Sequence, residues 1–312
     1  MTTQIKKAVV IGSGVMGSSL AQVFAMGGLD VVFVHGRYLG RAMELVTDGL
    51  KALVEFGQVR EAEIPAIISR IVPCERSALK TAVQDAQFVI EAAPEKPEIK
   101  KELLETLDEA CSPSTIIASN TSNLDVFAIA EMKHPERLVT AHFYVPAHII
   151  PLVEVAPGPK TSPETVLATR DLLTQLGKRP IVMKKFAPGY IVNKVQQFIA
   201  DAVFKILEDD LADPADIDLA VKLSLGIRLP LVGVVQTLDF TGLDVCVDIL
   251  RRQGKNIPFM EERVKQGKLG AKTSGGIYDY GGRSEAEILR KRDRLYLQMF
   301  EHLKELNAFD PI

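Results

Sequence analysis

Short apolar runs alternate with longer amphipathic stretches along the chain up to about Ala187. Unbroken apolar runs are typical of buried strands, whereas apolar positions three or four residues apart are typical of helices. Regular alternation of the two predicts an α/β fold with a Rossmann-type, doubly wound parallel sheet. The predicted strands are Ala8–Ile11, Val31–Val34, Arg70–Pro73, Phe88–Glu91, Ile116–Ser119, Leu138–His142, Val153–Val155 and Ile181–Met183, and the predicted helices are Val15–Met26, Arg41–Phe56, Pro97–Ala110 and Pro163–Leu176.

Beyond Ala187 the strand signals end and helical patterns follow. Asp213 and Pro214 form a typical helix start, because Asp caps a helix and Pro fits its first position. We therefore predict a nucleotide-binding domain over residues 1–186 and an all-helical C-terminal domain over residues 187–312. The helices predicted there are Ile191–Asp209, Pro214–Ser224, Leu243–Gln253 and Ser284–Asn307.

A G-x-G-x-x-G motif directly follows the first predicted strand and opens the first predicted helix. In a βαβ unit the first glycine makes the tight turn, the second admits a pyrophosphate and the third lets helix and strand pack closely. The helix N-terminus then binds the phosphates. The motif predicts dinucleotide contacts at Gly12, Gly14, Val15, Met16 and Gly17, and the alternative is a tight turn of an unrelated α/β fold.

The end of the second predicted strand bears on which dinucleotide is bound. An acidic residue usually stands there and binds the ribose 2′-hydroxyl of NAD. This chain has His35, followed by Gly36 and Arg37, with Arg41 one helical turn later. Arg37, Arg41 and His35 could surround a 2′-phosphate, which favours NADP. The alternative is that these side chains are solvated and that NAD binds without the acidic contact.

Two residues within apolar surroundings are candidates for acid–base chemistry. His142 ends a predicted strand, and Glu154 lies between Val153 and Val155 in the next one. A buried carboxylate needs a partner, and His142 can supply one if the chain doubles back. Such a glutamate would orient the imidazole and favour its protonated form. The alternative is an ordinary core or surface histidine.

Composition narrows the range of partners. The chain has 47% apolar and 25% charged residues and a net charge of −3, with no run of Lys or Arg, so a nucleic-acid partner is not expected. No apolar stretch is long enough to span a membrane, and the N-terminus lacks the apolar core of a signal peptide. Three scattered cysteines and five scattered histidines suggest a reducing cytoplasm and no metal site.

A set of motifs in this order along the chain resembles the 3-hydroxyacyl-CoA dehydrogenase family and its short-hydroxy-acid relatives, which include gulonate (lambda-crystallin-like) and carnitine dehydrogenases. The motifs are VIGSGVMGSSLAQ, EAAPE, SNTS, HFY-x-P, PLVEV, PGYIVNKV, DIDLAVKLSLG and LDFTGLD. The resemblance covers nearly the whole chain. It implies a nucleotide domain, a helical domain that forms a homodimer, and hydride transfer between a nicotinamide and a small-molecule alcohol or ketone.

The resemblance also implies roles for single residues. His142 matches the catalytic histidine of the family's H-F-F-N-P motif, and Glu154 matches the acid that orients it. Ser122 matches a residue that contacts substrate and cofactor, and Asn193 one that bonds the reacting oxygen. Cofactor contacts are implied at Ala93, Glu95, Lys100 and Asn120. The alternatives are a solvated helix face for Lys100, a helix cap for Asn193 and a turn or cap residue for Ser122.

Several positions depart from the family pattern. Val145 replaces the usual Asn after H-F-F, and Gln236 replaces the Glu of the usual Pro-Phe-Glu. Arg228 stands in SLGIRLP, which resembles the short-acid branch, where such an Arg holds a substrate carboxylate; a surface or interface role is its alternative. We therefore predict substrate contacts at Ser122, Val145, Asn193, Arg228 and Gln236. The predicted substrate is a 3-hydroxy or 3-keto compound, either an acyl-CoA or a short acid.

Two other functions stay open at this point. The same scaffold could reduce another small ketone or imine. Alternatively, the chain could be a crystallin-like protein that binds the cofactor with little catalysis, having lost activity through Val145 and Gln236. The retention of all four family site residues argues against the second alternative; they are Ser122, His142, Glu154 and Asn193.

Overall fold

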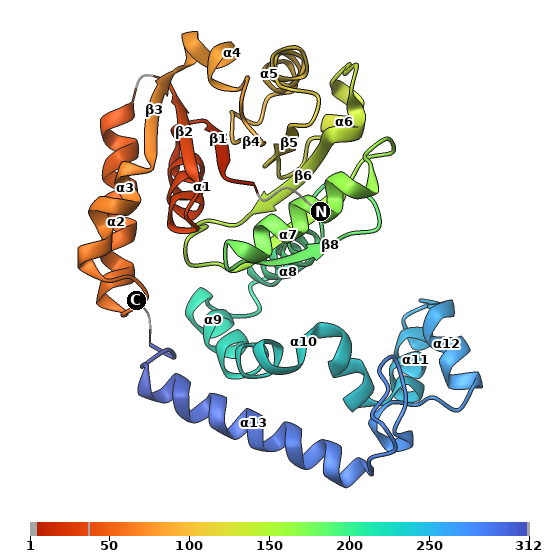
Figure 1. The fold of residues 1–312 in the computed structure, drawn as a ribbon. Helices are drawn as coiled ribbons and strands as arrows, with labels where there is room; N and C mark the ends of the chain where they lie inside the picture. The colour runs from red at the N-terminus through yellow and green to blue at the C-terminus, as the bar shows by residue number, and fades with distance from the viewer. Residues whose placement is uncertain (1–4, 37, 311–312) are drawn as a thin grey trace. The chain divides into compact units, whose positions relative to one another are not determined.

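The computed structural model describes residues 5–36 and 38–310 (Figure 1). It consists of two compact units, Met1–Gln197 and Phe198–Ile312, and each is described here by itself. The division falls inside a long helix, α8 (Val192–Glu208), which begins in the first unit and ends in the second. The domain boundary predicted between residues 186 and 187 stays a prediction.

The first unit is built on one eight-stranded sheet with the order β3-β2-β1-β4-β5-β6-β7-β8. The strands are β1 (Lys7–Ile11), β2 (Asp30–His35), β3 (Ile71–Glu75), β4 (Phe88–Glu91), β5 (Ile116–Ser119), β6 (Leu138–Phe143), β7 (Leu152–Pro157) and β8 (Arg179–Val182). All neighbours pair in parallel except β6 and β7, which are antiparallel. The α/β prediction is confirmed, with this one correction to a wholly parallel sheet.

Helices cover both faces of the sheet (Figure 1). They are α1 (Val15–Met26), α2 (Leu39–Glu55), α3 (Ile64–Ser69) and α7 (Pro163–Gln175) on one face, and α4 (Leu79–Ala82), α5 (Pro97–Ala110) and α6 (Val126–Ile129) on the other. Because successive strand side chains point to opposite faces, Ala8 and Val10 join one core cluster and Val9 and Ile11 the other. Both faces of β1 are therefore buried, as its apolar run predicts.

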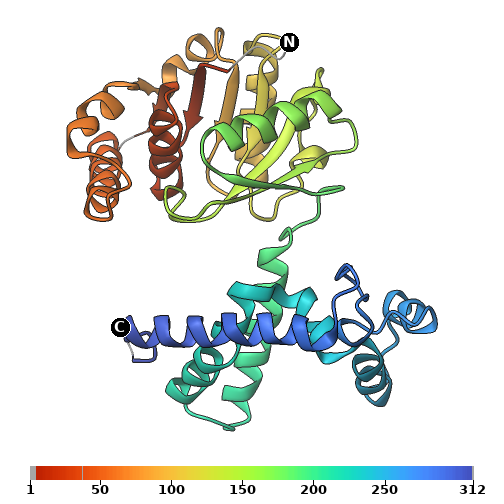
Figure 2. The same ribbon diagram turned by 60° about the horizontal axis from the view of Figure 1, so that its bottom comes forward.

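The second unit is helical. It contains the rest of α8, then α9 (Pro214–Leu223), α10 (Leu225–Thr241), α11 (Leu243–Arg252), α12 (Pro258–Lys265) and α13 (Glu285–Glu305). Ser284 and Glu287 form a capping box at the start of α13, which packs along α10 (Figure 2). α10 is broken at Gly233, where φ is 68°. This break interrupts the helical period, and the sequence analysis did not predict α10.

Within the described ranges, no single helix is long and apolar enough to cross a membrane. One bent pair, α10 with α11, passes by length and composition when taken together, with an angle of 82° between the two helices.

Candidate active site

The turn from β1 into α1 has the shape that a bound diphosphate requires. Gly12 has φ of 115°, and a Cβ on Gly17 would lie 1.7 Å from the carbonyl oxygen of Gly12, so both positions need glycine. A Cβ on Gly14 would meet nothing within 4 Å. α1 begins at Val15 with no side chain of the described residues capping it. The first N–H groups, including those of Val15 and Met16, are therefore available to a phosphate.

The end of β2 has an acidic neighbour that the sequence of β2 does not show. Nδ1 of His35 lies 2.8 Å from the carbonyl oxygen of Gly36, and Arg41 pairs with Glu44 at 3.3 Å. Arg37 lies outside the described residues. The pairing of β2 with β3 makes Glu75 the register partner of His35, so an acidic residue does stand next to this position. It comes from the neighbouring strand, which reading one strand alone cannot reveal.

His142 and Glu154 face each other across the antiparallel pair β6–β7, where they are register partners. Nδ1 of His142 lies 3.2 Å from Oε2 of Glu154, and Nε2 lies 3.3 Å from Oγ of Ser122. The His142 side chain is buried, with the residue 3% exposed. The three predicted residues therefore form one chain of contacts, with the imidazole in its centre.

Glu154 is also bonded to the start of α8. Its Oε1 accepts hydrogen bonds from the backbone N–H groups of Ile191, at 2.9 Å, and Val192, at 3.2 Å. A carboxylate at a helix N-terminus is stabilised by the helix dipole. Burial alone would raise the pKa of Glu154, but hydrogen bonds from His142, Tyr144 and these N–H groups outweigh burial and hold the pKa below its ordinary value. Glu154 is thus a fixed negative charge behind the imidazole.

Two tyrosines complete the surroundings of His142, and the sequence analysis named neither. The Tyr190 ring stacks on the imidazole at 4.6 Å and 13°, and its hydroxyl donates to the Thr121 carbonyl at 3.0 Å. The Tyr144 ring lies edge-on at 4.6 Å, and its hydroxyl donates to Oε2 of Glu154 at 2.5 Å. Both tyrosines stand within quoted motifs, HFY and PGY, but only the fold shows what they contact.

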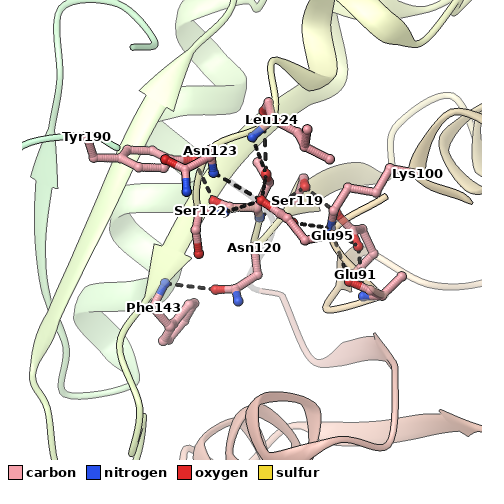
Figure 3. Close-up of polar contacts among 12 residues, drawn as sticks. Glu91, Glu95, Lys100, Ser119, Asn120, Ser122, Asn123, Leu124, Phe143 and Tyr190 are labelled. Atoms are coloured by element: carbon pink, nitrogen blue, oxygen red, sulfur yellow. Dashed lines mark hydrogen bonds and ion pairs between the residues drawn. The ribbon is translucent and has the colours of Figure 1, made fainter. Parts of the chain in front are cut away.

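The loop that carries Ser122 is held by Glu95 (Figure 3). Oε1 of Glu95 accepts hydrogen bonds from the Thr121 hydroxyl at 2.6 Å, the Ser122 N–H at 2.9 Å and the Asn123 N–H at 3.0 Å. Burial would raise the pKa of Glu95, and these hydrogen bonds together with Lys100 lower it overall. Glu95 thus fixes the position of Ser122, and its predicted contact with the cofactor stays a prediction.

Lys100 is buried, with 1% of the residue exposed, so its alternative as a solvated helix residue is wrong. Its ammonium lies 2.8 Å from both carboxylate oxygens of Glu91 and 3.3 Å from Glu95 (Figure 3). Glu91 also accepts hydrogen bonds from the Ser119 hydroxyl and from the Ala93 N–H, the latter at 2.9 Å. Burial raises the pKa of Glu91, and these partners oppose that rise. This ionic network fixes the loop after β4, where Ala93 was predicted to contact the cofactor.

Asn120 follows β5, and Asn193 lies on α8. The Asn120 side-chain oxygen accepts a hydrogen bond from the Phe143 N–H at 2.8 Å, which joins the ends of β5 and β6 (Figure 3). Asn193 lies inside the first turn of α8, one residue after its start, so the helix-cap alternative does not hold. The predicted contacts of Asn120 with cofactor and of Asn193 with substrate stay predictions.

The remaining predicted substrate contacts, Val145, Arg228 and Gln236, lie in different places. Val145 is 56% exposed in the loop after β6. In the second unit, the Arg228 guanidinium donates to Oγ of Ser224 at 3.0 Å. Gln236, on α10, lines a cavity of about 220 Å³ with residues of α10, α13 and the segment before α13, including Phe240 and Tyr280. Their predicted contacts with substrate stay predictions.

The glycine turn on a doubly wound sheet, with Ser122 after the carboxyl end of β5 and a histidine–carboxylate pair across β6 and β7, defines a dinucleotide-dependent dehydrogenase. The model of the 3-hydroxyacyl-CoA dehydrogenase NAD-binding domain matches residues 7–186, and that of the 3-hydroxyacyl-CoA dehydrogenase C-terminal domain matches residues 189–280. The chain belongs to the 3-hydroxyacyl-CoA dehydrogenase family.

Similar proteins agree with this assignment. A 5-formyl-3-hydroxy-2-methylpyridine 4-carboxylate 5-dehydrogenase of Mesorhizobium japonicum is 30% identical over 306 residues, which cover 93% of this chain and 96% of that protein. A 3-hydroxybutyryl-CoA dehydrogenase of Bradyrhizobium diazoefficiens is 33% identical over 293 residues, 90% of this chain and 98% of that protein. The crystal structure of a 3-hydroxyacyl-CoA dehydrogenase of Archaeoglobus fulgidus superposes with a TM-score of 0.78 at 26% identity, covering 96% and 99% of the two chains.

Proposed function

We propose that this enzyme transfers hydride between a nicotinamide dinucleotide and the hydroxyl- or keto-bearing carbon of a small 3-hydroxy or 3-keto compound, with His142 carrying the proton. The observation that supports this most strongly is the position of the imidazole. One ring nitrogen faces Glu154 and the other faces Ser122, at 3.2 and 3.3 Å. A histidine held in this way is suited to general acid–base catalysis near neutral pH.

Each residue of the site has its own role in the proposed reaction. When bound, the cofactor supplies the hydride chemistry; Gly12, Gly14 and the N-terminus of α1 would hold its diphosphate. In the oxidative direction, the O–H bond of the alcohol breaks and Nε2 of His142 takes the proton, while the carbinol C–H electron pair leaves as hydride and the carbonyl forms. In the reductive direction, the imidazolium returns that proton to the carbonyl oxygen. Glu154 stabilises the imidazolium, and Ser122 orients the reacting oxygen.

For the substrate we favour a short keto or hydroxy acid over a long acyl-CoA. Val145 offers an apolar side chain where the family has an amide, and Gln236 is neutral where the family has a carboxylate. Arg228 supplies a cation that would pair with a substrate carboxylate. The experiment is a panel of keto acids, neutral ketones and acetoacetyl-CoA with reduced cofactor.

We expect short keto acids to give the highest kcat/KM of this panel. Arg228→Ala should raise KM for the acids by about tenfold or more, because one charge-assisted contact is lost, and should leave neutral ketones unchanged. If acetoacetyl-CoA is the best substrate and Arg228→Ala has no effect, the short-acid proposal is wrong and ordinary acyl-CoA chemistry replaces it.

For the cofactor we favour NADP over NAD, because β2 ends in His35 rather than in an acid. We expect a higher kcat/KM with NADPH than with NADH. His35→Asp places a carboxylate where it would bind a ribose 2′-hydroxyl and repel a 2′-phosphate, so it should shift the ratio toward NADH by about tenfold or more. Glu75→Gln is the matched variant on β3. If this substitution by itself raises the preference for NADPH, Glu75 supplies the acidic contact from the neighbouring strand. A wild type that prefers NADH would contradict the proposal.

The helical unit supports a further proposal, a homodimer formed through that unit. Several of its large apolar side chains face solvent in the single chain, among them Phe198, Phe204 and Leu211. A contact between two copies at these side chains would remove them from water. A cytoplasmic location, suggested by three cysteines that are free in the structure, stays a proposal.

A further inference from the structure

Two donors compete for one oxygen atom of Glu154. The hydroxyl of Tyr144 lies 2.5 Å from Oε2, and Nδ1 of His142 lies 3.2 Å from the same Oε2. The other oxygen, Oε1, is taken by the N–H groups of Ile191 and Val192. The shorter contact belongs to the tyrosine, so the histidine does not have sole use of the carboxylate that orients it.

This second donor depends on a single difference in the motif around the histidine. The family pattern reads H-F-F-N-P, whereas this chain reads HFYVP, with Tyr144 at the third position. A phenylalanine there would keep the edge-on ring beside His142 but would have no hydroxyl to give to Glu154. The added hydroxyl is therefore separable from the packing of the ring.

We propose that Tyr144 is a positioning residue that draws on the charge of Glu154 and thereby lowers the tendency of His142 to hold a proton. This proposal rests on the proposed function of His142. A hydrogen bond from a neutral hydroxyl disperses the charge of the carboxylate, so an imidazolium gains less from facing it. The neutral imidazole, which is the form that accepts a proton from an alcohol, is then favoured.

The remaining groups around His142 do not take part in this competition. The Tyr190 hydroxyl donates to the Thr121 carbonyl and not to Glu154. Ser122 is uncharged, and the Glu95 carboxylate is occupied by the N–H groups of Ser122 and Asn123 and by Lys100. Burial, followed by the contact with Glu154, raises the pKa of Tyr144, so its hydroxyl keeps its proton and remains a donor.

The test is a pH titration of the His142 imidazole by NMR in the purified full-length chain, in the wild type and in Tyr144→Phe. The signal is assigned by its loss in His142→Gln. We expect the titration midpoint to rise by roughly 0.5–1 pH unit in Tyr144→Phe, as part of one charge-assisted hydrogen bond passes to the imidazole. Tyr190→Phe, which keeps the ring stacked on His142 and removes a hydroxyl bonded to the Thr121 carbonyl, should leave the midpoint unchanged.

A midpoint in Tyr144→Phe that is unchanged or lower than in the wild type would overturn the proposal. If Tyr144→Phe does not fold, Tyr144→3-fluorotyrosine keeps the ring and makes the hydroxyl a stronger donor, so the titration midpoint of His142 should fall. A midpoint that does not fall in that variant would also overturn the proposal. Because the NMR titration needs no turnover, it can fail while the dehydrogenase activity is present. Conversely, absence of activity on every substrate tested would contradict the proposed function and leave the titration result standing.

Discussion

At the scale of single residues, two carboxylates hold the site together. Glu154 accepts hydrogen bonds from His142, Tyr144 and the start of α8, and Glu95 accepts three from the loop of Ser122. Each carboxylate therefore orders groups from distant parts of the chain. A small change at either should displace a catalytic residue without removing it.

Glu95→Ala is predicted to lower kcat by about ten- to hundredfold, because the loop that carries Ser122 loses three hydrogen bonds. The binding of reduced cofactor, followed by fluorescence, should change much less. Glu98→Ala, at an exposed position in the first turn of α5, is the control and should retain wild-type kcat. A Glu95→Ala variant that lost cofactor affinity but kept kcat would make Glu95 a cofactor ligand instead.

The sequence alone paired His142 with Glu154, because a carboxylate in apolar surroundings needs a partner, and the family resemblance added Ser122. It did not reveal Tyr144 or Tyr190 as neighbours of the histidine. The 2.5 Å contact between the Tyr144 hydroxyl and the Glu154 carboxylate depends on how the loop after β6 lies against β7. A local sequence pattern does not predict such a tertiary contact.

At the scale of elements, local signals decided what could be predicted. Strands β4 and β5 and helices α1 and α5 have the predicted bounds. The two strands are clear apolar runs, α1 is a buried helix flanked by glycines, and α5 is an amphipathic helix that begins at a proline. Helices α3, α4 and α6 were missed because they are too short to show a helical period. The antiparallel pairing of β7 was missed because strand direction is set by tertiary contacts.

The glycine turn gives a matched pair of variants. Gly17→Ala puts a methyl group 1.7 Å from the Gly12 carbonyl oxygen, so α1 must move from β1. We expect a loss of about 1–3 kcal/mol or more in the free energy of unfolding, measured by urea denaturation. Gly14→Ala meets open space within 4 Å, so it should spare stability but weaken cofactor binding by blocking the approach of the diphosphate. Equal losses of stability in the two variants would contradict this assignment.

At the scale of the whole molecule, the helical unit is distinguished by the apolar surface that the single chain leaves uncovered. Phe198, on α8, is 77% exposed, and Phe204 lies further along the same helix. Burial of such side chains against a second copy is favourable by about 25 cal/mol per Å² of apolar surface.

Light scattering on the purified chain should therefore give the mass of a dimer at micromolar concentration. The double variant Phe198→Glu, Phe204→Glu should shift the mass toward that of a monomer, since buried charges oppose association. Lys265→Glu, at an exposed position on α12, changes charge without removing an apolar side chain and should stay dimeric. A wild type that is monomeric would refute the homodimer.

The central claim is that His142 carries the proton that accompanies hydride transfer. The most direct measurement is the single-turnover rate of cofactor oxidation in His142→Gln, compared with the wild type, on the best keto substrate at saturating cofactor. We predict a fall of roughly 10²–10⁴-fold with nearly unchanged cofactor affinity, as expected when a general acid is lost. A His142→Gln variant that turns over at close to the wild-type rate would contradict the claim.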